Sequence, residues 1–175
     1  MFAKLRSNYN LSNVLVRILF VLAFVFANWQ TGLASVGMME SVVGMSFGAY
    51  KLYLALASCA VLGLVLMFLL PVVVNFALNL MKIYSVPRAE YCLLAHAFFS
   101  LGFFICGVLN LVNVFTPVMV VWGRVLFPFI SSFVAALAFY KVTSKLYFND
   151  VTAVHYFKAF STAYLVVVLV LEVLA

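Results

Sequence analysis

The sequence predicts an all-α integral membrane protein with five transmembrane helices, on three observations. Hydrophobic residues make up 69% of the 175 and charged residues only 8%, with a mean hydropathy of +1.27, whereas about a quarter of the residues in a soluble domain are charged. The apolar runs are apolar on every side, as in residues 54–74, while a β-barrel strand alternates in polarity. A helix needs about 20 such residues to cross a bilayer. The chain therefore accommodates about five crossings as a single transmembrane domain, residues 1–175.

The first span is expected at about residues 11–34. Lys4 and Arg6 precede it as in a signal peptide, but the apolar stretch is longer than a signal core, so we expect a retained signal anchor. A glycine- and methionine-rich segment, residues 35–48, follows with Glu40 as its only charge. This segment is apolar enough to lie on the membrane surface, or to dip into it, without spanning.

The second span is expected at about residues 49–81, which is longer than one crossing requires. Pro71 lies inside it. Proline removes a backbone hydrogen bond and clashes with the preceding turn, so we predict one long helix kinked near Leu70. Two short spans are the alternative.

Three further spans are expected at about residues 89–112, 117–140 and 151–174. A tight turn joins the first two of these into a helical hairpin, and Pro117 suits the first turn of a helix. The polar stretch 141–150 is expected to connect the hairpin to the last span.

Lysine and arginine positions predict the orientation, because cytoplasmic loops carry an excess of these residues. With the N-terminus inside, the outer side holds only Lys51 and Arg124. The inner side then holds Lys4, Arg6, Arg17, Lys82, Arg88, Lys141, Lys145 and Lys158. This asymmetry predicts an N-in, C-out protein with an odd number of spans.

Arg124 and Glu172 are the clearest charged residues inside predicted spans, near the outer ends of the fourth and fifth. A charge costs at least about 2.5 kcal/mol at the bilayer centre, so both are candidate functional residues. One reading is an Arg124–Glu172 ion pair, supported by Asn110 and Asn113 at the outer end of the third span. The other, which we favour, is that both side chains extend separately to the lipid headgroups.

His96, Asn75 and Asn79 are further candidates for interhelical polar contacts. His96 is expected about two turns into the third span, and the two asparagines one turn apart near the inner end of the second. Histidine can relay protons near neutral pH, but the only carboxylate on its own helix is Glu90, at the membrane edge. Hydrogen bonding between helices is therefore the favoured reading.

The sequence lacks several motifs that are typical of enzyme active sites and cofactor-binding sites. It contains no glycine-rich phosphate loop, no pair of histidines four residues apart and no C-x-x-C. We therefore expect no catalytic, cofactor-binding or metal site. The basic residues are scattered singly, so no nucleic acid is expected as a partner, and Cys59, Cys92 and Cys106 are interpreted as small hydrophobic residues.

The organisation of residues 49–174 resembles the Yip-domain family of five-span membrane proteins. The resemblance lies in Asn75-Phe76-Ala77-Leu78-Asn79-Leu80, in Glu90-Tyr91-Cys92-Leu93-Leu94-Ala95-His96-Ala97, and in the link from Tyr140 through Asp150 to Ala163. It implies a trafficking or membrane-organising protein with no catalytic residue. The family's aspartate-leucine-tyrosine-glycine signature is absent, so Rab binding is not implied.

These features favour a non-catalytic multi-pass protein that binds other membrane proteins and lipids as a subunit or scaffold of a larger membrane assembly. A small transporter or channel subunit is the first alternative, and a water-accessible polar path would favour it. A membrane-embedded lipid enzyme is the second. A bacterial inner membrane and a eukaryotic organelle membrane are both compatible with the sequence.

Overall fold

The computed structural model describes residues 9–83, 88–115, 123–147 and 150–174. Within these ranges, it leaves out the side chains of residues 9–12, 123–125, 146–147, 150–153, 156, 169 and 171–174. The described helices are α2 (Tyr9–Val43), the short 3-10 helix η1 (Gly48–Tyr50), α3 (Lys51–Leu80), α4 (Arg88–Phe115), α5 (Gly123–Tyr147) and α6 (Asp150–Leu174). No strand occurs among these residues, so the predicted all-helical class is confirmed for the described part of the chain.

Four stretches of the described chain are long and apolar enough to cross a membrane. They are Asn13–Val43, Gly48–Leu80, Arg88–Phe115 and Leu126–Lys145. The described apolar stretch of α6, Phe157–Val168, is shorter than a bilayer crossing. The fold is therefore compatible with an integral multi-pass membrane protein.

Helix α2 is longer than the sequence predicts. It continues to Val43 instead of giving way near Ala34 to a separate surface segment at residues 35–48. Val36 is buried in this extension, so the extra turns gain packing against the rest of the chain. The helix ends where Gly44 adopts a φ of 70°, a conformation that costs glycine little, and the Gly44 amide donates to the Glu40 carbonyl at 2.9 Å.

Helix α5 differs from the prediction at its C-terminal end. Residues 141–147 continue the helix instead of forming a polar connection. Thr143 is fully buried there, and its hydroxyl donates to the Phe139 carbonyl at 2.8 Å. The polar side chain is thus satisfied inside its own helix, which lets one face of this segment pack. The predicted start of the fourth span at Pro117 lies outside the described residues.

Helix α3 runs without interruption through Pro71. The alternative of two short spans is therefore wrong. At 1.5 Å per residue its 30 residues extend about 45 Å, more than the roughly 30 Å hydrocarbon core requires.

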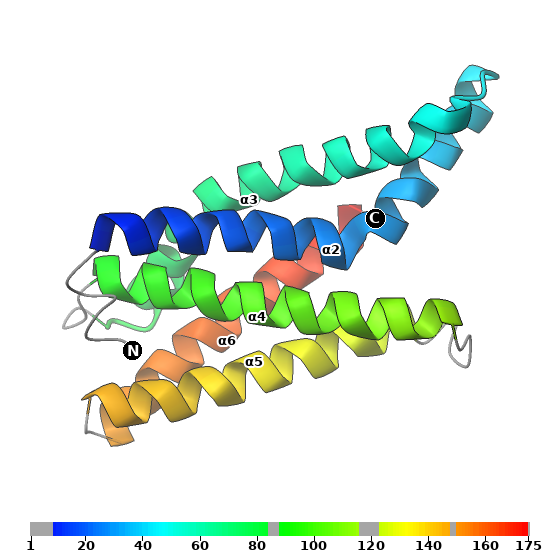
Figure 1. Ribbon diagram of the computed structural model, residues 1–175. Coiled ribbons are helices and arrows are strands. Elements are labelled where there is room, and N and C mark those ends of the chain that lie inside the picture. Colours follow the sequence, from blue (N-terminus) through cyan, green and yellow to red (C-terminus); the bar gives the residue numbers. More distant parts are fainter. Residues whose placement is uncertain (1–8, 84–87, 116–122, 148–149, 175) are drawn as a thin grey trace.

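Helix α4 lies at the centre of the fold and is the most buried of the four helices long and apolar enough to cross a membrane. Helix α2 packs mainly against α4 and α3, while α5 packs against α4 and α6. Towards its C-terminal end, α2 turns away from α4 and accompanies α3, so the α2–α3 hairpin extends beyond the other helices (Figure 1).

An aromatic cluster fills the interior of the bundle. Its rings contact one another in edge-on, tilted and stacked arrangements, and Phe139 and Phe160 stack with centroids 4.4 Å apart. The cluster consists of Phe20, Phe24, Tyr91, Phe98, Phe99, Phe103, Phe139, Phe160 and Tyr164. Aromatic pairs in such arrangements contribute about 0.5–1.5 kcal/mol beyond the burial of their area.

Small residues provide the space that this packing needs. A Cβ added at Gly102 would lie 2.9 Å from ring carbons of Tyr164, and one at Gly63 would lie 3.0 Å from the Phe24 ring. At Gly32 the added atom would meet the Cys59 Sγ at 2.7 Å and the Ala55 carbonyl at 3.0 Å. Close approach at small residues is the usual packing of helices in lipid.

Candidate functional site

His96 on α4 is a deeply buried polar group that joins two helices. Its side chain is 3% exposed. One ring nitrogen, Nε2, lies 3.1 Å from the Met67 carbonyl of α3, and the other, Nδ1, lies 2.7 Å from the Cys92 carbonyl of its own helix. The Phe20 ring of α2 packs edge-on against the imidazole. His96 therefore lies where α2, α3 and α4 meet.

Pro71 explains why the Met67 carbonyl accepts a hydrogen bond from another helix. In a regular α-helix this carbonyl would receive the amide of the residue four positions later, which here is Pro71 and has no N–H. A buried carbonyl without a donor costs about 1–3 kcal/mol. The His96 Nε2, 3.1 Å away, supplies the missing donor when it carries the ring proton.

A neutral imidazole has a single N–H, so it donates to only one of the two carbonyls at a time. The Cys92 carbonyl lies in the regular interior of α4 and has the His96 backbone amide as its helical donor. The Met67 carbonyl has no such donor. We therefore expect the tautomer with the proton on Nε2.

Two carbonyls near the middle of α2 accept hydrogen bonds from the neighbouring helices. The Asn110 Nδ2 of α4 donates to the Ala27 carbonyl at 2.9 Å. The Cys59 thiol of α3 donates to the Asn28 carbonyl at 3.4 Å. The Asn28 amide itself bonds to Phe24 within α2. These contacts join α2 to α3 and α4 close to the point where α2 changes its neighbours.

Asn75 and Asn79 do not share a polar pocket with His96. The Asn79 side chain is exposed and accepts a hydrogen bond from the Arg88 Nη2 at 2.9 Å. The Asn75 Oδ1 is buried with no hydrogen-bond partner among the described residues. His96, Asn75 and Asn79 therefore lie in separate environments. Among the described residues, no continuous polar path connects them.

The Arg124–Glu172 pair lies outside the described residues, because neither side chain is among those described. Asn113, one turn beyond Asn110 on α4, is half-buried. Asn110 bonds to α2 instead of facing the fifth span.

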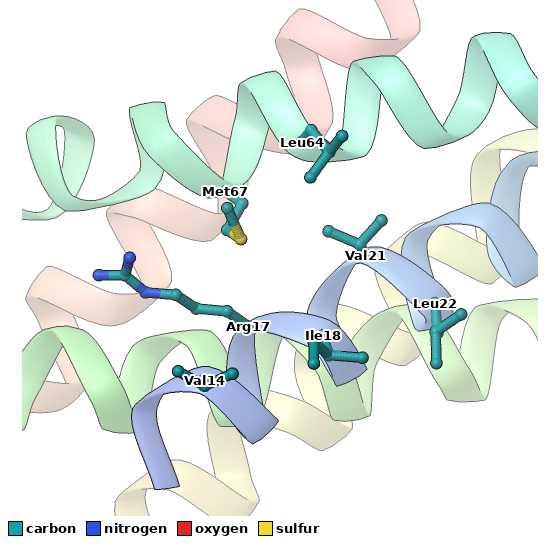
Figure 2. Close-up of a pocket in the computed structure, with 7 residues that line it drawn as sticks. All are labelled: Val14, Arg17, Ile18, Val21, Leu22, Leu64 and Met67. Carbon is teal, nitrogen blue, oxygen red and sulfur yellow. The ribbon is translucent and has the colours of Figure 1, made fainter. Parts of the chain in front are cut away.

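Arg17 lies in a groove between helices, which the sequence did not predict. It lies on α2, about 12 Å along the helix from Tyr9, and its Nε is buried without a hydrogen-bond partner. Its side chain lies at one end of a groove between α2 and α3 of about 370 Å³ (Figure 2). The groove is lined by Val14, Arg17, Ile18, Val21, Leu22, Leu64 and Met67.

The turn between α2 and α3 is held by a second set of polar contacts. Glu40 Oε2 forms an ion pair with Lys51 Nζ at 2.6 Å, and Glu40 Oε1 accepts the Phe47 amide at 2.9 Å. We call residues 38–54 the hairpin tip. The ion pair joins the end of α2 to the start of α3 and so fixes the geometry of this tip.

Apolar side chains cover most of the hairpin tip and are exposed. Val42 is 85% exposed, Tyr50 72% and Tyr53 70%. The others are Met38, Met39, Val43, Met45, Leu52 and Leu54. Methionine side chains are flexible and adapt well to binding surfaces of different shape.

The described residues contain no group of three or more histidine, cysteine or acidic side chains placed to hold a metal ion. Comparison with protein-family models, with curated proteins and with solved structures gives no match. The resemblance to the Yip-domain family therefore stays a prediction.

Proposed function

We propose that this chain is a non-catalytic membrane protein of five spans, N-in and C-out, that acts as a subunit or scaffold of a larger membrane assembly. The exposed apolar hairpin tip is the observation that carries the proposal. Large exposed apolar surfaces outside a bilayer mark sites of association. The tip would be the surface that receives the partner.

Helix lengths support the placement of the tip outside the bilayer. Helix α2 has 35 residues and extends about 52 Å, while α4 has 28 and extends about 42 Å. Both exceed the roughly 30 Å hydrocarbon core. Helix α2 is thus about 10 Å longer than α4, and its additional turns end in the hairpin tip.

The interior of the bundle favours assembly over transport. A transported solute needs a polar, hydrated path, and discontinuous helices usually provide its binding site. Aromatic rings fill the described core instead, and α3 is continuous. The buried contact of His96 and the partly buried hydrogen bond of Asn110 end on backbone carbonyls of neighbouring helices, which suits a role in helix packing.

Photo-crosslinking in the native membrane tests the proposal. A photoreactive amino acid would replace Met39 or Tyr53 of the tip, which are 58% and 70% exposed. Phe133 on α5, 65% exposed, is the matched control. We expect a discrete protein adduct from the two tip positions and lipid adducts alone from the control. A lone monomer that gives no protein adduct, and that moves a solute across liposomes, would overturn the proposal.

Cysteine accessibility tests the orientation separately. In a variant without native cysteines, Ser46→Cys in the turn after α2 should react with an impermeant thiol reagent from outside. Lys82→Cys, just beyond α3, should react only after the membrane is opened. A reporter fused after residue 175 should lie outside if there are five spans, and inside if there are four.

A further inference from the structure

The groove between α2 and α3 combines an apolar lining with a single cation. Six of its seven lining residues are aliphatic or methionine, and the seventh is Arg17. Val14, Ile18 and Leu22 are 57%, 55% and 60% exposed, so the groove is open along its α2 side. In a membrane, that side faces the lipid acyl chains. Its volume of about 370 Å³ is within the usual range for small-molecule sites.

Arg17 lacks a counter-ion within the protein as described. No hydrogen bond or ion pair joins its guanidinium to any residue that the structure describes, and its Nε is buried. A charge at this depth is costly unless it is paired or reaches the headgroup level. Figure 2 shows the guanidinium directed away from Leu22, towards the N-terminal end of α2. The charge therefore lies at the end of the groove nearer the membrane surface.

We propose that this groove binds one anionic phospholipid, with an acyl chain along Ile18, Val21 and Leu64 and the phosphate against the Arg17 guanidinium. Arginine forms two parallel hydrogen bonds with a phosphate group, which suits a fixed headgroup site. Basic pockets between transmembrane helices on the cytoplasmic side bind anionic headgroups. A zwitterionic lipid would fill the groove equally well but would offer the guanidinium a weaker electrostatic attraction.

The lipid site contributes to the α2–α3 contact. Met67 lines the groove with its side chain and accepts the His96 hydrogen bond with its carbonyl. A lipid in the groove would thus contact α2 and α3 at the level where α4 also joins them. The site requires a protein embedded in a membrane, and it does not depend on the assembly proposed above.

Native mass spectrometry of the purified protein tests the site by titration with dioleoyl phosphatidylglycerol and with dioleoyl phosphatidylcholine, which carry the same acyl chains. We expect the wild type to bind the anionic lipid about fivefold more tightly, as for one basic residue near an anionic headgroup. Arg17→Gln should remove this preference, and Arg17→Lys should retain most of it. Arg88→Gln, which removes a charge near the same end of the bundle, is the matched control and should retain it.

The groove itself is tested with tryptophan at two neighbouring exposed positions of α3. Leu64 lines the groove and Val65 does not, yet they are 46% and 48% exposed. Leu64→Trp should weaken the binding of both lipids, whereas Val65→Trp should leave it unchanged. Equal effects of the two tryptophans, or of Arg17→Gln and Arg88→Gln, would overturn the proposal. So would competition by glycerol phosphate as effective as that by the intact lipid, which would indicate a site for soluble anions.

Discussion

The contact between His96 Nε2 and the Met67 carbonyl can be tested by a substitution that changes little else in the fold. His96→Phe keeps an aromatic ring beside Phe20 but removes the donor. The Met67 carbonyl would then lack both its interhelical donor and the helical amide that Pro71 cannot supply.

The expected cost follows from the burial and geometry of the contact. The ring is 3% exposed and the Nε2–O distance is 3.1 Å, so water cannot readily replace the lost donor. An unsatisfied buried carbonyl costs about 1–3 kcal/mol, while measured hydrogen bonds between membrane helices average about 0.6 kcal/mol and reach about 1.7. We therefore expect His96→Phe to lower the free energy of unfolding by about 1–2 kcal/mol.

Pro71→Ala provides the decisive comparison. It restores an amide that can donate to the Met67 carbonyl within α3, so the same histidine substitution should cost less in this background. The coupling energy in the double-mutant cycle should be about 1 kcal/mol. Reversible unfolding in mixed micelles, followed by circular dichroism, would measure all four proteins.

Ser100→Ala is the matched control for this cycle. The Ser100 hydroxyl is also buried on α4, but it donates to the His96 carbonyl of its own helix at 2.7 Å. Its cost should be the same with proline or alanine at position 71. If His96→Phe likewise costs the same in both backgrounds, the assignment of the Met67 carbonyl as its essential acceptor is wrong.

Three further predictions concern the packing of the bundle and the hairpin tip. Gly102→Ala should lower the free energy of unfolding by about 1–3 kcal/mol, because the added methyl overlaps the Tyr164 ring, and Tyr164→Leu should recover part of this loss. Recovery of none of it in the double variant would place the damage elsewhere. Asn110→Leu should cost about 0.6–1.7 kcal/mol in the same assay, as for other polar contacts between membrane helices, and an unchanged stability would argue against the bond to α2. Glu40→Gln should speed amide hydrogen exchange at residues 44–47 by weakening the contact with Lys51 and should leave α4 unaffected. Faster exchange throughout α4 would contradict a purely local role.

Much of the fold could be predicted from the sequence because the dominant signal is local. Continuous apolar runs such as residues 54–74 specify helices in lipid wherever they occur in a chain, since no water is present to satisfy the backbone. The positions of α3 and α4 followed from this signal within a few residues. The ends of α2 and α5 did not, because buried side chains such as Val36 and Thr143 extend those helices through tertiary packing.

The candidate site was less predictable, since its groups come from different helices. Pro71 alone indicates that the Met67 carbonyl lacks a helical donor, and His96 alone indicates a buried polar group. The sequence places Pro71 inside the second span and groups His96 with Asn75 and Asn79 as candidates for interhelical polar contacts. The arrangement of α3 beside α4 decides that His96 reaches Met67 instead.

By itself, the sequence determined the all-helical class and the apolar stretches long enough to cross a membrane, because hydropathy acts through the solvent and needs no neighbour. Only the tertiary structure decided which backbone carbonyls the His96 and Asn110 side chains contact. It also decided which glycines make room for the aromatic rings of neighbouring helices. In the sequence, Arg17 served only to predict orientation, whereas the structure shows it as the one cation among the described residues that line an apolar groove. Such features depend on distances between helices, which a linear pattern of residue types does not contain.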